Sequence, residues 1–199
     1  MAGAVQLFTA DSAIAQQNPP CDVVTDFVTG GGFIVLDTNG AHGNFGVAGG
    51  CKNRSFWGHL EYVDHGSVLA PPSAPTPFNV HWMSITAYFP DSSDPTNKAR
   101  FICGTARTNL PEPNDNVDFA VRAKDDHEPG VDDEFDIQLT RPQGNPAVNV
   151  IVYTTNFNFA GPPHKLNDGA GGGGNIQLHG PRADAGSCPA RVGFIGAPA

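Results

Sequence analysis

The chain has 199 residues and a mass of 20.9 kDa, and its 20 acidic residues against 11 basic ones give a net charge of −9. The lysines and arginines are scattered, so no basic stripe could follow a phosphate backbone, and we expect no nucleic-acid partner. No apolar run approaches the roughly 18 residues of a membrane-spanning helix, so we expect no membrane span.

The glycine and proline content predicts the fold class. The chain has 24 glycines and 18 prolines, about a fifth of its residues, which is typical of short strands joined by many turns. Two glycine runs, Gly30–Gly32 and Gly171–Gly174, each stand directly before a stretch of alternating apolar and polar residues. We therefore expect an all-β protein, a single β-sandwich-like domain of about nine antiparallel strands with extended N- and C-terminal arms.

Alternating stretches separated by turn residues place the strands along the chain. In chain order we predict strands at Val23–Leu36, Asn44–Gly50, Phe56–Val63, Asn79–Phe89, Arg100–Arg107, Val117–Lys124, Glu134–Thr140, Val148–Thr155 and Asn175–His179. We expect residues 1–20 to form an N-terminal arm, residues 21–181 the β domain and residues 182–199 a C-terminal tail.

The four cysteines predict the compartment of the protein. They form no Cys-x-x-Cys pair, and an even count in a β protein rich in glycine and proline favours two disulfides and a secreted, extracellular or cell-surface location. Three pairings are possible. We prefer Cys51–Cys103, which would link two core strands, and Cys21–Cys188, which would tie the chain ends together. Free buried thiols are the alternative.

A series of short motifs keeps its order along most of the chain. The motifs are Val28–Ile34, Gly43–Val47, Gly58–Tyr62, Ala99–Ala106, Asp118–Asp125, Glu128–Gly130, Asp133–Ile137 and Gly172–His179. Over roughly residues 22–181 this series resembles the post-COAP-1 domain of secreted and surface-attached bacterial proteins. The resemblance implies an extracellular β-sandwich-like module that often accompanies adhesion or anchoring segments, and it brings no catalytic residues.

An acidic loop is the strongest candidate for a metal site. Ca²⁺ prefers six to eight oxygen ligands, and a tight loop between two strands could bring Asp125, Asp126, Asp132 and Asp133 around one ion. The spacing is not that of an EF-hand, and a solvated acidic turn is the alternative. Calcium is therefore a possible cofactor, and no other cofactor is indicated.

Catalytic patterns are weak. Glu61, Asp64, Glu128 and Glu134 could serve glycoside hydrolysis only if two of them faced one sugar bond, and no spacing indicates that they do. The seven histidines form no His-x-His pair, and the sequence has no nucleophile elbow and no phosphate-binding loop. We expect a protein that is not an enzyme.

Two features suggest binding partners. Trp57 with Tyr62, or Trp82 with Tyr88, could stack on sugar rings, although a core position for at least one tryptophan is the alternative.

The N-terminal segment Ala4–Thr9 has weak strand character, with Val5, Leu7 and Phe8 as its apolar residues. Such a segment can add a strand to a partner's sheet edge, and it can also fold back on its own domain. The sequence thus predicts a structural or adhesive module that self-associates into a fibre or matrix by strand donation. A carbohydrate- or ligand-binding module is the alternative.

Overall fold

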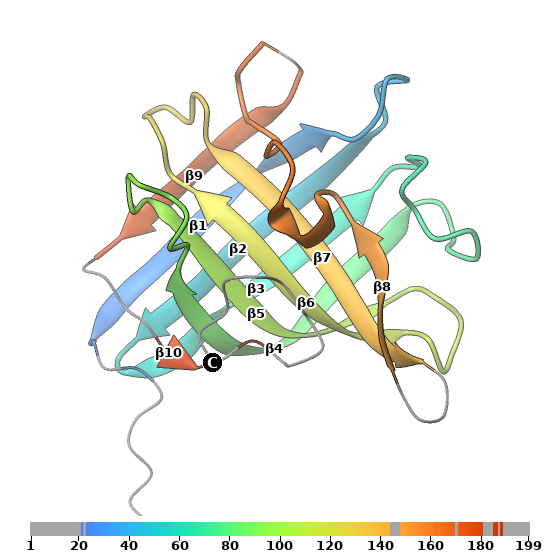
Figure 1. Ribbon diagram of the computed structural model, residues 1–199, viewed down its shortest axis with the longest axis horizontal. Helices are drawn as coiled ribbons and strands as arrows, with labels where there is room; N and C mark the ends of the chain where they lie inside the picture. The colour runs from blue at the N-terminus through green and yellow to red at the C-terminus, as the bar shows by residue number, and fades with distance from the viewer. Residues whose placement is uncertain are drawn as a thin grey trace, which may run out of the picture.

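The structure is a computed structural model that describes residue 21 and residues 23–143, 148–169, 171–180, 185–186 and 188. Its elements are β1 (Thr25–Val35), β2 (His42–Lys52), β3 (Ser55–Asp64), β4 (Phe78–Pro90), β5 (Ala99–Thr108), β6 (Asn116–Lys124), β7 (Glu134–Gln143), β8 (Val148–Thr154), the 3-10 turn η1 (Phe157–Phe159), β9 (Gly173–His179) and β10 (Ala185–Gly186). The nine predicted strands correspond to β1–β9, so the all-β prediction is confirmed (Figure 1).

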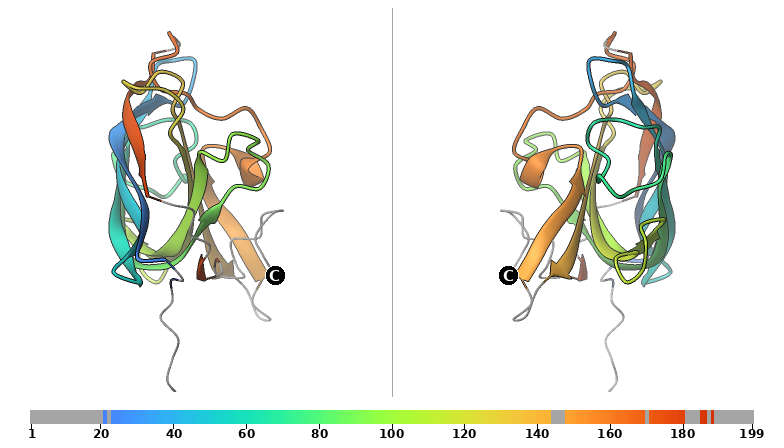
Figure 2. Two further views of the ribbon diagram at one scale, coloured as in Figure 1. Left: turned by 90° about the vertical axis from the view of Figure 1, so that its left-hand side faces the viewer. Right: turned by 90° about the vertical axis from the view of Figure 1, so that its right-hand side faces the viewer.

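The strands form one curled antiparallel sheet in the order β8-β7-β6-β5-β4-β3-β2-β1-β9, and the short strand β10 pairs with β4. We call β9, β1, β2 and β3 the first half, and β4 to β8 the second half. The curl turns the two halves toward each other, as the side views show (Figure 2). A sandwich of two separate sheets, as the sequence suggested, is not confirmed, because the backbone hydrogen bonds continue from one half into the other.

The core lies between the facing halves. Phe45 on β2 stacks on Phe135 on β7 with ring centroids 3.9 Å apart, and Leu60, Ile102 and Phe119 are also buried there. Alternation along the strands produces this core, because every second side chain of a strand points to the same face.

A smaller layer covers the outer side of the second half. There Phe89, Phe101 and Cys103 form a separate apolar cluster, and Phe159 of η1 packs against it. Strand β7 is therefore buried on both faces: Phe135 faces the core, while Asp136 on the other face is covered.

The disulfide pairing differs from the one that we preferred. The structure joins Cys21 to Cys51 and Cys103 to Cys188, with Cα–Cα distances of 5.9 and 5.2 Å. The predicted links Cys51–Cys103 and Cys21–Cys188 are both wrong, because Cys21 and Cys51 belong to the core between the halves, whereas Cys103 and Cys188 belong to the outer cluster. Cys103 points to the outer cluster, where Cys188 meets it.

Candidate functional site

The sheet has an incomplete joint where its two halves meet. Strand β2 pairs with β3 along its whole length, but β4 pairs with β3 only from Glu61 to Asp64. Beyond that point β4 turns away through irregularities between Trp82 and Ser84 and between Ile85 and Ala87. Among the described residues, no strand pairs with the second edge of β3 over 55–60. We call this edge and the facing stretch 82–85 of β4 the seam.

A cavity of about 410 Å³ opens in the seam. It is lined by Phe56, Trp57, Gly58, His59, Trp82 and Ile85. Both tryptophans of the chain are therefore at this one place. The seam is thus an aromatic cavity beside a stretch of strand edge that no described strand pairs, a combination suited to binding an extended chain or a sugar.

The two sides of β3 give the cavity two kinds of wall. Phe56 lies on the side that faces the core and packs against it, as do Trp82 and Ile85 from β4, yet all three keep exposed surface. Trp57 and His59 point the other way, toward solvent. The inner wall is consequently apolar and only partly covered.

The outer wall continues into an aromatic row across the first half. Phe27 packs edge-on against Trp57 at 5.2 Å and stacks on His179 at 4.7 Å, measured between ring centroids. The Lys52 ammonium lies 4.6 Å from the centroid of the Trp57 ring. These contacts hold Trp57 in place at the rim of the cavity.

Of the four aromatic residues considered for stacking on sugars, Trp57 and Trp82 keep exposed surface in the seam, whereas Tyr62 and Tyr88 are fully buried. The prediction for Tyr62 is wrong, because Tyr62 is fully buried and its hydroxyl lies 2.7 Å from that of Tyr153. The Tyr153 hydroxyl in turn donates to the Asp64 carboxylate at 3.0 Å. Burial raises the pKa of Tyr62 far above its ordinary value. Tyr62 is a core residue with a satisfied hydroxyl.

The acidic loop seals the edge of the sheet at β9. The backbone N–H of Ile176 donates to Asp133 Oδ2 at 2.7 Å, and that of Leu178 donates to Asp125 Oδ2 at 2.9 Å. Asp133 Oδ1 also accepts from the N–H of Asp126 at 2.8 Å. Carboxylates thus occupy the backbone donors that an edge strand would otherwise offer to another chain.

The other two carboxylates of the loop contact lysines. The Lys124 ammonium lies 3.6 Å from Asp126, and that of Lys165 lies 3.1 Å from Asp132. Within the part of the chain that the structure describes, no three or more His, Cys, Asp or Glu side chains are grouped to hold a metal ion. The geometry therefore gives the calcium prediction no support, and it assigns the loop to the sheet edge instead.

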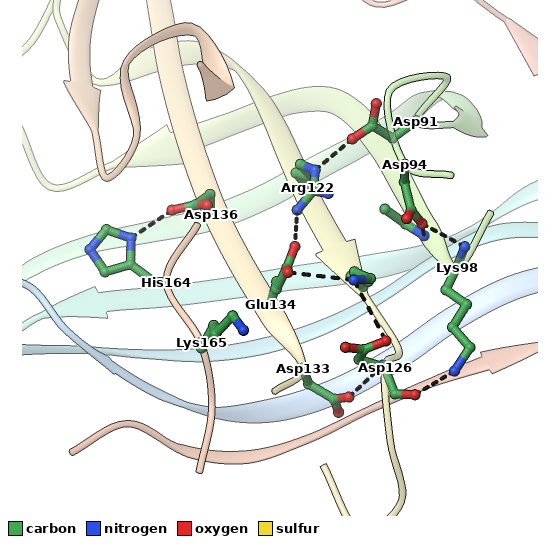
Figure 3. A network of polar contacts seen from close by, with 12 residues as sticks. Asp91, Asp94, Lys98, Arg122, Asp126, Asp133, Glu134, Asp136, His164 and Lys165 are labelled. Atoms are coloured by element: carbon green, nitrogen blue, oxygen red, sulfur yellow. Dashed lines mark hydrogen bonds and ion pairs between the residues drawn. The ribbon is translucent and has the colours of Figure 1, made fainter. Parts of the chain in front are cut away.

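A polar network covers the outer face of β6 and β7 (Figure 3). Arg122 bridges Asp91 and Glu134, and its Nε lies 2.7 Å from Asp91. Burial opposes the charge of Arg122, but the hydrogen bonds to these two carboxylates raise its pKa. Burial also acts to raise the pKa of Asp94, yet hydrogen bonds from Thr96 and nearby backbone N–H groups lower it to about 2. Arg122 and its two carboxylates thus pair with one another, which suits a structural role in holding the loop after β4 against β6 and β7.

Three of the four carboxylates considered for glycoside hydrolysis have separate structural roles. Glu61 is exposed and pairs with His81, Asp64 is buried beside Ser67, and Glu134 binds Arg122. The structure thus places no two of these three around a common cavity.

The predicted assembly residues Val5, Leu7 and Phe8 lie outside the described residues. The described chain starts, however, beside the seam. Cys21 is bonded to Cys51, and its backbone N–H donates to the carbonyl of Arg54 at 3.4 Å, in the turn just before β3. Cys21, the residue that follows the N-terminal arm, therefore lies at the end of the seam where β3 begins.

Comparisons of this chain with models of protein families, with curated proteins and with solved structures give no match. In the described part of the structure, no helix is long and apolar enough to cross a membrane.

Proposed function

We propose that this protein is a non-enzymatic extracellular module that self-associates by strand addition and so serves in a structural or adhesive assembly. In this proposal the N-terminal arm of one copy pairs with the seam of another. The observation that carries it is the edge of β3 over 55–60, which no described strand pairs. Pairing of an added strand with such an edge supplies main-chain hydrogen bonds, and side-chain pockets beside the edge supply specificity.

Two further observations support the proposal. The β9 edge is sealed by Asp125 and Asp133, so the seam is better placed than this outer edge to accept a strand. Two disulfides suit an oxidising, extracellular setting. The motif resemblance to the post-COAP-1 domain agrees with a surface or secreted role.

Removal of residues 1–20 tests the proposal. We expect the full chain to form fibres or higher oligomers and the truncated chain to be a folded monomer, because the donor segment is lost. Light scattering after size exclusion measures the mass, and electron microscopy with and without reductant shows the form of the assemblies. Circular dichroism and a thermal melt check that the truncated chain folds. Assemblies that persist after truncation would refute strand donation by the arm.

A second candidate function is carbohydrate binding, and the cavity that contains both tryptophans favours it. An indole at the rim can stack on a sugar ring while His59 offers a polar contact. We expect binding on a glycan array to be lost in Trp57→Ala and kept in Phe157→Ala, which removes an exposed aromatic ring far along the chain. Equal binding by both variants would place the glycan elsewhere.

A further inference from the structure

We infer that the donated segment completes the core of the acceptor, with Val5 and Leu7 of a second copy facing inward onto Phe56, Trp82 and Ile85. This inference rests on the proposed function and names the acceptor site and the face of the donor that enters it.

The described residues cover the inner wall of the seam only in part. The inner wall consists of three residues that pack on the core from one side but are only partly buried: Phe56, Trp82 and Ile85. Leu60, which lies four positions after Phe56 on the same face of β3, is fully buried. The difference follows from the pairing, because Leu60 lies next to Glu61, the last residue of β3 that pairs with β4, whereas Phe56 lies farther along the edge that β4 does not pair. A strand inserted at 55–60 would place two side chains over this apolar surface and remove it from water.

The donor has the pattern that this surface requires. In an extended segment Val5 and Leu7 share one face, and Gln6 shares the other face with Phe8. If Val5 and Leu7 turn toward the core, Gln6 meets solvent and Phe8 lies on the outer side, where the aromatic row of Trp57 and Phe27 runs. Six residues, Ala4–Thr9, match the six residues of edge at 55–60.

The sequence next to Cys21 favours donation to another copy. Pro19 and Pro20 directly precede this cysteine, and proline restricts both itself and the residue before it to extended conformations. The disulfide and the contact of Cys21 with Arg54 fix the point of departure. The two prolines favour an extended chain directly before Cys21, so a turn that returned residues 4–9 to their own seam would have to be made farther upstream.

The test uses the full chain and its two tryptophans, which are both in the seam and therefore report its occupancy. The variants are Leu7→Asp, which puts a charge on the inward face, and Gln6→Asp, a matched control that puts the same charge on the outward face. Over a series of protein concentrations, light scattering gives the association constant, and quenching of tryptophan fluorescence by iodide gives the accessibility of the seam.

We expect tryptophan protection to rise with concentration in the original chain and in Gln6→Asp. In Leu7→Asp the association constant should fall by about 100-fold, because burial of an unpaired carboxylate costs several kcal/mol, and the tryptophans should stay accessible.

Other results separate the inference from the proposed function. If the chain assembles while its tryptophans remain accessible, or if Leu7→Asp and Gln6→Asp behave alike, then the seam is not the acceptor and the inference fails. If the chain stays monomeric with protected tryptophans that Leu7→Asp exposes, the arm docks on its own domain, so assembly and donation by a second copy are both refuted. A monomer with accessible tryptophans refutes the inference and the proposed function together.

Discussion

The Arg100→Met variant is expected to lose about 3 to 5 kcal/mol of its free energy of unfolding, because it removes one partner of a buried ion pair. Arg100 is 2% exposed, and its Nη2 lies 3.8 Å from Oδ2 of the fully buried Asp26. The Tyr88 hydroxyl donates to the other oxygen of Asp26 at 2.6 Å. These groups come from β5, β1 and β4 and join the facing halves of the sheet, so without the guanidinium a buried carboxylate loses the cation that faces it.

Urea unfolding followed by fluorescence measures this effect. The matched control is Arg107→Met, which makes the same change on the same strand at a side chain that is 61% exposed and lies 3.4 Å from Asp115. An exposed pair of this kind contributes about 0 to 1 kcal/mol, so Arg107→Met should unfold close to the original chain. Similar losses in the two variants would show that the buried pair has no special role.

The Asp133→Ala variant is expected to lose about 2 to 4 kcal/mol and to gain a new tendency to associate. Both oxygens of this carboxylate accept backbone hydrogen bonds, from Ile176 and from Asp126, and a buried donor left without its acceptor costs about 1 to 3 kcal/mol. Burial raises the pKa of Asp133, although these hydrogen bonds oppose the shift. Loss of the carboxylate would unseal the edge of β9.

Thermal melting and light scattering measure the two parts of this prediction. The control is Asp132→Asn on the same loop. The Asp132 carboxylate pairs with Lys165, and both side chains are partly exposed. Asparagine is chosen because residue 132 has a φ of 64°, which asparagine tolerates better than alanine does. In the Leu7→Asp background the new association should persist, because it uses β9 and not the seam. If Asp133→Ala melts like Asp132→Asn, the loop does not stabilise the sheet edge.

The strands could be predicted from the sequence because their signals are local. Alternation of apolar and polar residues and the turn residues between them indicate where strands lie, and the nine predicted ranges overlap β1–β9. The same rule explains the error at Tyr62. Trp57 and Tyr62 are an odd number of positions apart on one strand, so they point to opposite faces and could not both be at the surface site.

The features that the sequence did not reveal depend on contacts far apart in the chain. The disulfide partners follow from the layers of the fold, because Cys51 points into the core and Cys103 points to the outer cluster. The role of the acidic loop depends on β9, which lies more than 40 residues beyond Asp133. The seam arises because β4 stops pairing with β3 at Trp82, and no local sequence pattern around that residue predicts the separation of the two strands.

The seam also determines how the module would carry tension. Each disulfide lies within one half of the sheet or ties a chain end to it, since Cys51 belongs to β2 and Cys103 to β5, and neither crosses the joint. The backbone connection between β3 and β4 consists of the four residue pairs from Glu61 to Asp64. A pulling force that separates the halves would act on this short joint as well as on the contacts of Asp125 and Asp133 with β9. A strand donated into the seam would lengthen the joint, so that assembly would stiffen every module that accepts a neighbour.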